Sequence, residues 1–350
     1  MTISYQLFKV LSPGLFTTVQ DRGRYGYQRY GVPVSGAMDV FAASLANLLV
    51  GNGDDAAVLE CTVTGPGFFV LDHARVAVTG ADMPIFLNGQ AVAGWSSFRV
   101  KTGDVLEIGR AQSGCRSYVA VTGGFEVPPV MGSRSCNVGA GIGGLHGRPL
   151  QKEDGLCRGI GPILPEPRRI PAELVPKYPD RKILRAVPGP QDDYFDEGLD
   201  MFFSSDFIVS HESNRMGYRL SGPEIRQKTG KPTSIISESS LPGGVQIPPN
   251  GQPIILLAEQ TVGGYTKIAT VISSDLDLIG QATPGNSIRF QRVDLQTAYV
   301  LKRKQQQIID HLKEIVVLTD TVRDLQKEFA AENEDAAARH FADLYPECIW

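Results

Sequence analysis

Short runs of apolar residues that end in Gly, Asp or Asn dominate the chain up to about residue 292. They are rich in Val, Ile and Phe and recur at roughly ten-residue spacing, which is typical of strands in a sandwich or barrel. In the first half, runs with this pattern lie at 68–71, 74–79, 98–101, 105–108 and 117–121. Leu87-Asn88-Gly89-Gln90 predicts a hairpin with a type I′ turn, because Asn and Gly tolerate the positive φ angles of that turn.

One helix interrupts this β pattern. Residues 37–50 carry apolar side chains at helical spacing, namely Met38, Phe41, Ala42, Leu45, Leu48 and Leu49. Gly51-Asn52-Gly53 follows directly and is a good C-terminal signal for a helix. We therefore expect a helix over 37–50 inside an otherwise β-rich first domain.

A proline-rich stretch separates two β-rich halves. Prolines recur between 149 and 190, and such a stretch cannot continue as a helix or a central strand. Apolar runs of strand length then resume between 182 and 291. These changes predict a first β domain over 1–147, a surface connector over 148–181 and a second β domain over 182–294.

The tail over 295–350 has a third pattern. From 295 to 344 it is charged, rich in Gln and free of Gly and Pro. One apolar stripe has helical spacing and consists of Leu301, Ile308, Leu312, Ile315, Leu318, Val322, Leu325 and Phe329. This predicts a long amphipathic helix, with a break near Thr319-Asp320 as one variant. Its apolar face either packs on the chain's own domain or joins a second copy or another partner.

Bulk composition narrows the function classes. Of the 350 residues, 34 are Lys or Arg and 38 are Asp or Glu, so the net charge of −4 disfavours a general nucleic-acid binder. No apolar run is long enough to span a membrane, and the first residues do not resemble a signal peptide. The five cysteines are widely spaced, which favours free thiols in a reducing compartment, the cytoplasm. They are Cys61, Cys115, Cys136, Cys157 and Cys348.

Common cofactor motifs are missing or lack their context. Residues 139–144 match GxGxxG, but neither a strand before them nor a helix after them is expected, so dinucleotide binding is disfavoured. A mobile glycine loop near a site is the better interpretation. The sequence has no GxxxxGK[ST] and no GxSxG, and its histidines show no metal-ligand spacing. We expect no bound metal in this chain.

Three polar clusters rich in Gly or Arg are candidates for a site. The first is the loop over 16–39, where Gly allows close backbone approach and Arg offers a fork of donors for carboxylate or phosphate. The second lies at 213–220, and the third at 259–265 follows an apolar strand on a Gly-Gly turn. Ordinary salt-bridged or hairpin turns are the structural alternative, and a single-stranded nucleic-acid surface is disfavoured by the acidic total. We predict that the three clusters converge on a pocket for a small anion.

Several long strings resemble one known family. They include Val19-Gln20-Asp21-x-Gly23-Arg24-x-Gly26, Gly31-Val32-Pro33-x-Ser35-Gly36-Ala37-Met38-Asp39, Met131-Gly132-Ser133-Arg134-Ser135, Arg215-Met216-Gly217-Tyr218-Arg219-Leu220 and Gly263-Gly264-Tyr265. Together with Gly114-Cys115-Arg116, Gly123-Gly124 and Pro248-x-x-Gly251-Gln252-Pro253, they occur in order over roughly 5–292. The sequence is similar to the allophanate hydrolase subunit 2 family, also called biotin-dependent carboxyltransferase-like. That family includes the C subunit of the ATP-dependent 5-oxoprolinase.

The resemblance implies a fold, partners and an activity. The fold would be two cyclophilin-like β-barrel domains. The partners would be a B-type subunit of the same complex and a third, A-type subunit. The reaction would be ATP-driven ring opening of 5-oxo-L-proline to glutamate, and ATP with Mg would act through the complex. Other relatives form the half of urea carboxylase that moves a carboxyl group from carboxybiotin to urea, and one antagonises a kinase inhibitor in sporulation.

Candidate site residues follow from the clusters and the resemblance together. We predict Glu259 as acid or base, Arg24 and Arg215 as catalytic cations, and the amides of Gly263-Gly264 as oxyanion donors. Substrate contacts are predicted for Asp21, Arg22, Ser35, Gly36, Tyr218, Glu238, Gln246, Thr261, Gly263, Gly264 and Tyr265.

One departure separates the function hypotheses. The family commonly has ADRQTTGGY where this chain has Ala258 to Tyr265, AEQTVGGY, which is one residue shorter. If Glu259 replaces the Asp, an acid is kept, and otherwise Ala258 takes that place. We expect the C-type component of a 5-oxoprolinase. The alternatives are a carboxyltransferase half that uses biotin from another protein and a non-catalytic protein that binds and antagonises a partner.

Overall fold

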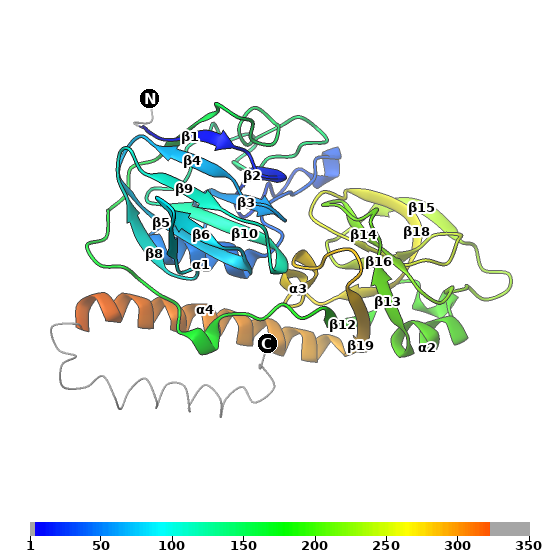
Figure 1. Cartoon of the computed structure of the whole chain (residues 1–350). Coiled ribbons are helices and arrows are strands. Elements are labelled where there is room, and N and C mark those ends of the chain that lie inside the picture. Colours follow the sequence, from blue (N-terminus) through cyan, green and yellow to red (C-terminus); the bar gives the residue numbers. More distant parts are fainter. Residues whose placement is uncertain (1–3, 323–350) are drawn as a thin grey trace.

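Residues 4–322 are described by the computed structural model, with side chains up to residue 316. The chain is mainly β and forms two domains with a long helix beneath them (Figure 1). The first domain contains two antiparallel sheets, one in the order β11-β1-β4-β9-β6-β7 and one in the order β2-β3-β10-β5-β8. Their strands are β1 (Tyr5–Ser12), β2 (Phe16–Gln20), β3 (Val58–Thr62), β4 (Gly67–Val70), β5 (Ala74–Asp82), β6 (Ile85–Leu87), β7 (Gln90–Val92), β8 (Ser97–Val100), β9 (Val105–Ile108), β10 (Ser113–Val121) and β11 (Gly155–Arg158).

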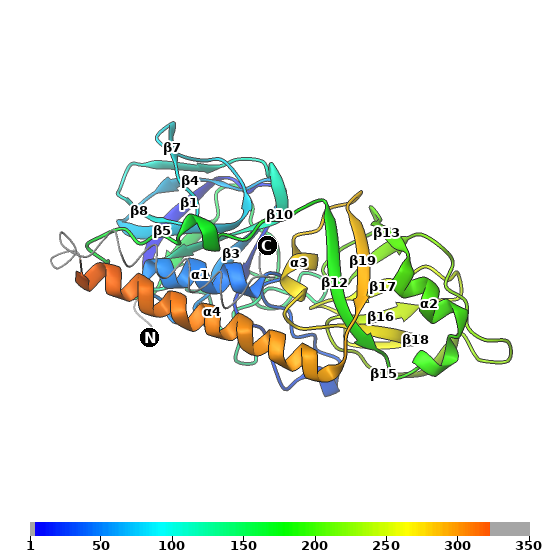
Figure 2. The ribbon, with the colours of Figure 1, turned by 90° about the horizontal axis from the view of Figure 1, so that it is seen from below.

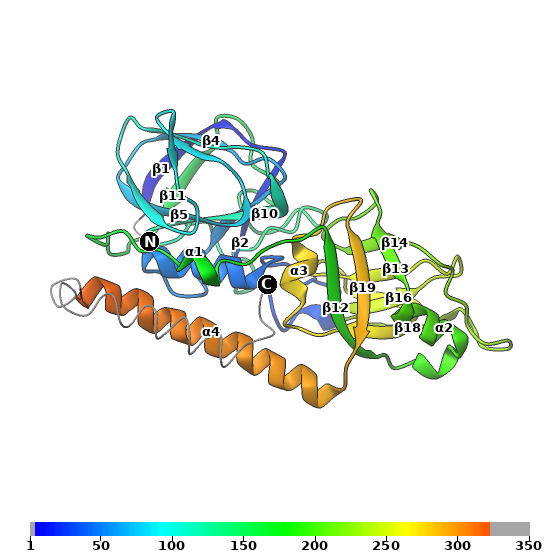
Figure 3. The ribbon, with the colours of Figure 1, turned by 60° about the horizontal axis from the view of Figure 1, so that its bottom comes forward.

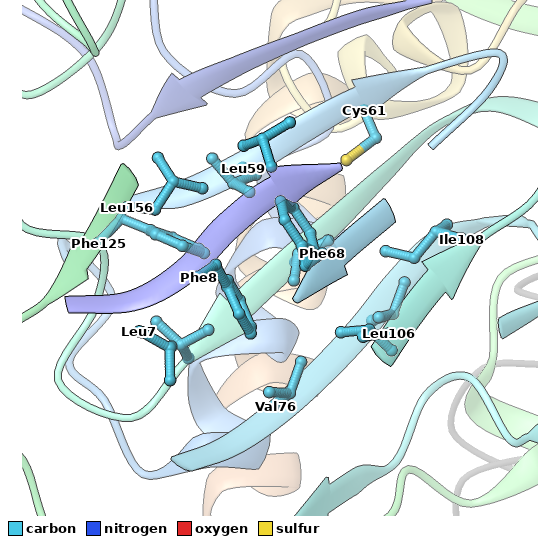
Figure 4. Close-up of a cluster of buried hydrophobic side chains, with 14 of the residues drawn as sticks. Leu7, Phe8, Leu59, Cys61, Phe68, Val76, Leu106, Ile108, Phe125 and Leu156 are labelled. Carbon is cyan, nitrogen blue, oxygen red and sulfur yellow. The ribbon is translucent and has the colours of Figure 1, made fainter. Parts of the chain in front are cut away.

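The two sheets curve around one apolar core (Figure 3). Phe8 of β1 and Phe68 of β4 stack with ring centroids 4.6 Å apart, and Phe125 lies beside Phe8 (Figure 4). The predicted hairpin is confirmed, because Asn88 (φ 52°) and Gly89 (φ 75°) both have the left-handed backbone of a type I′ turn between β6 and β7. The strand pattern of this half therefore forms a two-sheet core.

Helix α1 (Val40–Val50) packs on the five-stranded sheet, with Ala42, Leu45 and Leu49 fully buried. The predicted helix is confirmed, but it begins at Val40. Asp39 caps it by accepting a hydrogen bond from the Ala42 backbone N–H at 2.8 Å. The helix does not start at residue 37 because Asp39 still has an extended backbone (φ −116°, ψ 91°) and serves as the N-cap.

The stretch predicted as a connector contributes a strand to the first domain. β11 lies between Pro149 and Pro162 and pairs antiparallel with β1. After it the chain follows the first domain, where Ile170 donates a backbone hydrogen bond to the Trp95 carbonyl at 2.9 Å. A 3₁₀ turn, η2 (Ala172–Leu174), follows. The prolines therefore flank β11 and lie outside it.

The second domain is a closed barrel. Strand β12 pairs with β19 on one side and with β18 on the other, which closes seven strands in the order β12-β19-β13-β14-β17-β16-β18. β15 pairs with β18 and lies outside the ring. The strands are β12 (Arg181–Pro188), β13 (Asp206–Val209), β14 (Gly217–Ser221), β15 (Ser234–Ser239), β16 (Gly244–Ile247), β17 (Ile254–Leu256), β18 (Val262–Val271) and β19 (Ser287–Arg292). A barrel is thus present here, and the cyclophilin-like character expected of both domains stays a prediction.

Short helices complete this domain. α2 (Glu197–Ser204) inserts Phe202 against Phe290 of β19, with ring centroids 4.2 Å apart. α3 (Leu276–Gly280) lies at the junction with the first domain. The 3₁₀ turns η1 (Gln28–Tyr30) and η3 (Asp192–Tyr194) lie in the first-domain loop and after β12.

Helix α4 (Leu295–Val322) runs beneath both domains (Figure 2). Ile308, Leu312 and Val316 are buried in one cluster with α1. At the second domain, Gln305 Nε2 donates to Asp277 Oδ2 at 2.7 Å. The apolar face of this part of the helix therefore packs on the chain itself, and the expectations for 323–350 fall outside the described residues. None of the helices within 4–322 is long and apolar enough to cross a membrane.

We predict that Leu312→Ala lowers the free energy of unfolding by about 2–5 kcal/mol, because Leu312 is fully buried between α4 and α1. Urea denaturation followed by circular dichroism measures the change. Leu295→Ala, at a position 56% exposed in the same helix, is the matched control and should change it by less than about 0.5 kcal/mol. Equal effects of the two variants would show that α4 does not pack on α1 in solution.

Candidate functional site

The loop after β2 crosses to the second domain. The Ser35 backbone N–H donates to the Ala258 carbonyl at 2.9 Å, and the Gly36 N–H donates to Gln20 Oε1 at 3.1 Å. A Cβ at Gly36 would lie 3.0 Å from the Gly23 nitrogen, and the φ of 89° also favours glycine. The loop of the first domain is therefore fixed against the turn between β17 and β18.

Arg215 joins the three predicted clusters. Its Nη2 donates to the Gly36 carbonyl at 2.7 Å, its Nε donates to Glu259 Oε1 at 2.7 Å, and its Nη1 pairs with Glu60 Oε1. We call Gly36, Glu60, Arg215 and Glu259 the junction cluster. The side chains of Arg215 and Glu259 are 7% and 11% exposed. The predicted convergence of the three turns is thus seen, although the functional roles of their residues stay predictions.

The buried guanidinium of Arg215 is stabilised in its charged form by the two carboxylates beside it. Burial opposes the charge of Arg215, but Glu60 and Glu259 raise its pKa above the usual value. Every nitrogen of the guanidinium donates to an acceptor within the chain, so Arg215 has little left for a substrate. It orients the carboxylate of Glu259. We therefore assign Arg215 a positioning role in place of the predicted direct contact.

Two further residues of the junction were not predicted. Glu60 lies in β3 and is 1% exposed, and its Oε2 accepts from Met38 N at 2.8 Å and from the Tyr118 hydroxyl at 2.9 Å. Arg116 of β10 donates through Nη1 to the Tyr218 hydroxyl at 2.7 Å. Tyr218 is thereby buried against the first domain. A charged residue within a predicted or adjoining strand run was the available signal, Glu60 between Leu59 and Cys61 and Arg116 directly before the run at 117–121.

Asp21 organises the loop and does not face open space. Its Oδ1 accepts from Ser133 Oγ at 2.7 Å and Gly23 N at 2.8 Å, and its Oδ2 accepts from Arg134 N at 2.5 Å. It thus binds the Met131–Ser135 string that the resemblance also includes. Arg22 is the exposed residue here, at 53%, and its Nη1 lies 3.9 Å from Asp54.

Arg24 is fully buried. Its Nε donates to the Val130 carbonyl at 2.9 Å and its Nη2 to the Ser135 carbonyl at 2.7 Å. Desolvation lowers its pKa. A Cβ at Gly143 would lie 2.6 Å from Nη2, so the glycine-rich loop over 139–144 packs directly on this guanidinium. A direct contact between Arg24 and a substrate does not fit this position, and Arg24 instead holds two loops together.

The predicted Gly263-Gly264 turn is part of a strand. Both residues lie in β18, where Gly263 is opposite Glu238 of β15. The predicted oxyanion turn is therefore replaced by a paired ribbon. Thr261, which accepts from Ser240 N at 3.0 Å, and Tyr265, which is 38% exposed, lie on the same stretch.

The predicted substrate residues around this ribbon lie close together. Glu238 pairs with Lys267, and the amide of Gln246 lies against Gly263. This group and the junction cluster are connected by the β17–β18 turn that carries Glu259.

Two carboxyls at the N-terminus of α1 lie behind the junction. Asp39 Oδ2 accepts from the Tyr178 hydroxyl at 2.9 Å and from Gln281 Nε2 at 2.8 Å. Asp277 of α3 accepts from Val40 N at 2.8 Å. Burial and the neighbouring charge raise the pKa of Asp39 to about 7, and burial raises the pKa of Asp277 to about 6. Both carboxyls accept hydrogen bonds across the domain junction, so their protonation is linked to the contacts between the two domains.

The described residues support neither a metal site nor a cysteine nucleophile. Within 4–322, no group of three or more His, Cys, Asp or Glu side chains is placed to hold a metal ion. Cys136 lies near Arg24, Arg215 and Glu259, but burial raises the pKa of its thiol to about 11. A neutral buried thiol is a poor nucleophile. The arrangement instead offers an oriented carboxylate, Glu259, beside a ribbon rich in donors.

We predict that the stability of the chain falls as pH rises from about 4 to about 7. The pKa values of Asp39 (about 7) and Asp277 (about 6) lie above the ordinary 3.8, so the folded state binds protons more tightly than the unfolded state in this range. Asp39→Asn removes one titrating group. The advantage of the wild type over this variant should be larger at pH 5 than at pH 7.5 by at least about 1 kcal/mol in urea denaturation. Parallel pH profiles would contradict the assignment.

We predict that Arg215→Met lowers the free energy of unfolding by about 3–5 kcal/mol, because it leaves the buried carboxylate of Glu259 unpaired and leaves Glu60 with Arg116 as its remaining ion-pair partner, at 3.5 Å. Adding Glu60→Gln should restore part of the loss. Arg219→Met is the control, since Arg219 is half-exposed and its partner Glu212 is 3.6 Å away; it should cost less than about 1 kcal/mol. Similar losses in both single variants would argue against the junction cluster.

Comparisons with known proteins agree on one family. Residues 30–292 match the family described as "Carboxyltransferase domain, subdomain A and B". The chain is 40% identical over 311 residues to the protein named as the C subunit of 5-oxoprolinase in Escherichia coli (strain K12), and the match covers 87% of this chain and 97% of that protein. It is 35% identical over 330 residues to "Urea amidolyase" of Lachancea kluyveri, covering 88% of this chain and 18% of that protein.

A solved structure extends the likeness to three dimensions. The K. lactis urea amidolyase superposes with a TM-score of 0.83 at 32% identity, covering 89% of this chain and 20% of that one. This similarity spans both domains and the junction between them. The chain therefore belongs to the carboxyltransferase-domain family that spans subdomains A and B.

Proposed function

We propose that this chain is the C subunit of an ATP-dependent 5-oxoprolinase and acts with B-type and A-type partners. The observation that carries the proposal is the match to the E. coli protein of that name, which extends over 97% of that protein at 40% identity. A relative of matched length supports a shared role better than one of which this chain covers less than a fifth. The proposal places the complex in the cytoplasm.

The chain's own contribution centres on Glu259. Arg215 fixes its carboxylate at the domain junction, and its side chain retains 11% exposure. Opening a lactam requires proton transfers to or from the attacking water and the departing ring nitrogen. Glu259 is the residue we assign to hold or move such a proton. Gly36 and Glu60 keep Arg215, and through it Glu259, in place.

ATP supplies the driving force in this proposal by activating the poorly electrophilic lactam carbonyl. The described residues of this chain do not fit a nucleotide with Mg, because no group of three or more His, Cys, Asp or Glu side chains among them is placed to hold the metal. Every guanidinium nitrogen of Arg215 has a protein acceptor, and Arg24 is fully buried. ATP binding is therefore assigned to the complex. Arg22, which is exposed beside the junction loop, is the predicted cation best placed to face a partner-bound anion.

A carboxyltransferase half is the second candidate. The family description and the TM-score of 0.83 to urea amidolyase support it. In that case biotin would be delivered by another protein. The chain differs from the family's usual ADRQTTGGY string at 258–265, where Glu259 or Ala258 stands in for the Asp.

We predict that the purified chain, combined with the B- and A-type subunits of its own source, releases glutamate from 5-oxo-L-proline only when ATP is present. Glu259→Gln should lower the turnover number by about 10²–10⁴-fold, because the amide cannot transfer a proton. Coupled glutamate detection measures the rate. Glu212→Gln is the control, since Glu212 is 79% exposed and lies outside the junction cluster; it should leave the rate unchanged.

No ATP-dependent glutamate release with the authentic partners would remove the 5-oxoprolinase proposal. Saturable binding of free biotin to the same complex would then favour carboxyl transfer. A complex that forms normally, shows neither activity and is insensitive to Glu259→Gln would favour a binding protein.

A further inference from the structure

Strands β15 and β18 form an antiparallel ribbon in the second domain (Figure 1). Glu238 lies opposite Gly263 in this antiparallel pair, so both point to the same side. Side chains alternate along a strand, which places Lys267 on the Gly263 face. Ser240 directly follows β15, two residues after Glu238, and continues the pairing because its backbone N–H donates to the Thr261 carbonyl at 3.0 Å. The ion pair between Lys267 and Glu238 agrees with this placement.

Gln246 reaches the same face from the neighbouring strand. It lies opposite Lys267 in the β16–β18 pair. A Cβ added at Gly263 would lie 2.2 Å from its Nε2, so the amide occupies the space that any other residue at 263 would fill. A side chain at position 263 would therefore displace the amide of Gln246 from this place on the ribbon face. We call Ser240, Gln246 and Lys267 the ribbon donors.

The ribbon donors are buried and only partly satisfied. Ser240, Gln246 and Lys267 are 2%, 4% and 7% exposed. Ser240 Oγ and Gln246 Nε2 have no hydrogen-bond partner among the residues that the structure describes. Buried polar atoms without a partner are uncommon in folded proteins, and two on one face of a ribbon point to a group that binds there. Hydroxyl, amide and ammonium groups together offer donors, so the group is an anion.

Glu238 shows which anion fits. Its side chain is 46% exposed, whereas that of Lys267 is 8% exposed. It lies on β15, which has β18 as its one neighbour among the described strands. The carboxylate of Glu238 is therefore the exchangeable member of the pair, and it can turn into solvent while Lys267 remains in place. An external carboxylate of similar size would then contact the same ammonium group.

We propose that the ribbon donors form a carboxylate-binding site, with Glu238 as an internal competitor for the ligand. Where the proposed function holds, the ligand is the carboxylate of 5-oxo-L-proline. The Ser240 backbone N–H donates to the carbonyl of Thr261, two residues after Glu259 on the β17–β18 turn. In this proposal the lactam ring of the ligand points toward Glu259, which lies on the turn that leads into β18. This separates the role of Lys267, which binds, from that of Glu259, which handles protons.

The test measures ligand binding by calorimetry, using the full chain and its complex. The probes are 5-oxo-L-proline, cyclopentanecarboxylate, which lacks the lactam, and 2-pyrrolidinone, which lacks the carboxylate. The two carboxylates should compete with each other and bind at least about tenfold more tightly than 2-pyrrolidinone. Lys267→Met should weaken both carboxylates by at least about tenfold, and Lys228→Met, at a surface ion pair with Asp196, should have no effect.

Glu238→Gln gives a result that a purely structural ion pair would not. It removes the competing carboxylate, so both carboxylate probes should bind about threefold or more tightly. This variant also keeps the proposal testable if Lys267→Met does not fold, because Glu238 is half-exposed. Unchanged or weaker binding in Glu238→Gln, or no carboxylate binding at millimolar concentration, overturns the site.

The outcome separates the site from the proposed function. Lys267-dependent binding of cyclopentanecarboxylate, without ATP-dependent glutamate release by the complex, supports the carboxylate site and removes the 5-oxoprolinase proposal. Glutamate release with an unchanged KM for 5-oxo-L-proline in the Lys267→Met complex supports that activity and overturns the site. A raised KM with little change in kcat is the result expected when both hold.

Discussion

The desolvated charge of Arg215 is the constraint on which the junction of the two domains depends. A guanidinium buried this deeply is tolerated only when its donors are matched by acceptors. Here the acceptors come from three separate parts of the chain, the Gly36 carbonyl, Glu60 of β3 and Glu259 of the β17–β18 turn. Loss of any one of them leaves a buried guanidinium donor without its acceptor. The relative position of the domains is thus set by the same contacts that orient the candidate acid.

A division of labour follows from burial. The junction cluster is closed and fully engaged, so it suits the orientation of a group better than the capture of a ligand. The ribbon donors suit the capture of a ligand better. Two of their polar atoms have no hydrogen-bond partner among the described residues, and Glu238, which pairs with Lys267, is half-exposed and can be replaced by another carboxylate. β15 lies outside the closed barrel, which allows it to carry such a partner without disturbing the seven-stranded ring. The two groups meet at the turn between β17 and β18, where Glu259 is located.

Local patterns in the sequence predicted much of the fold, and their failures have physical causes. The Asn88-Gly89 hairpin and helix α1 depend on nearby residues and were foreseen, although the extended cap residue Asp39 places the start of the helix at Val40. β11 was missed because prolines flank it and only its pairing with β1 defines it.

At the site, the convergence of the three clusters was predicted. That the guanidinium groups of Arg24 and Arg215 donate to acceptors of the protein itself was not. Burial by distant segments determines both. Glu60 and Arg116 were missed for the same reason, since their partners lie in the other domain. The Gly-Gly pair was assigned to a turn because the space beside Gly263 is filled by Gln246, a residue of another strand, which the local sequence does not reveal.

Helix α4 braces the junction from beyond the residues that match the family, which end at residue 292. It contacts both domains, through Gln305 to Asp277 and through Lys313 to Asp54 at 2.8 Å. Asp277 in turn holds the first N–H group of α1, whose cap Asp39 donates its own backbone N–H to Tyr118, the partner of Glu60. A continuous path of hydrogen bonds therefore leads from α4 to the acceptor of Arg215. The matched family region provides the junction, and the helix that follows it supports the α1 and α3 side of that junction.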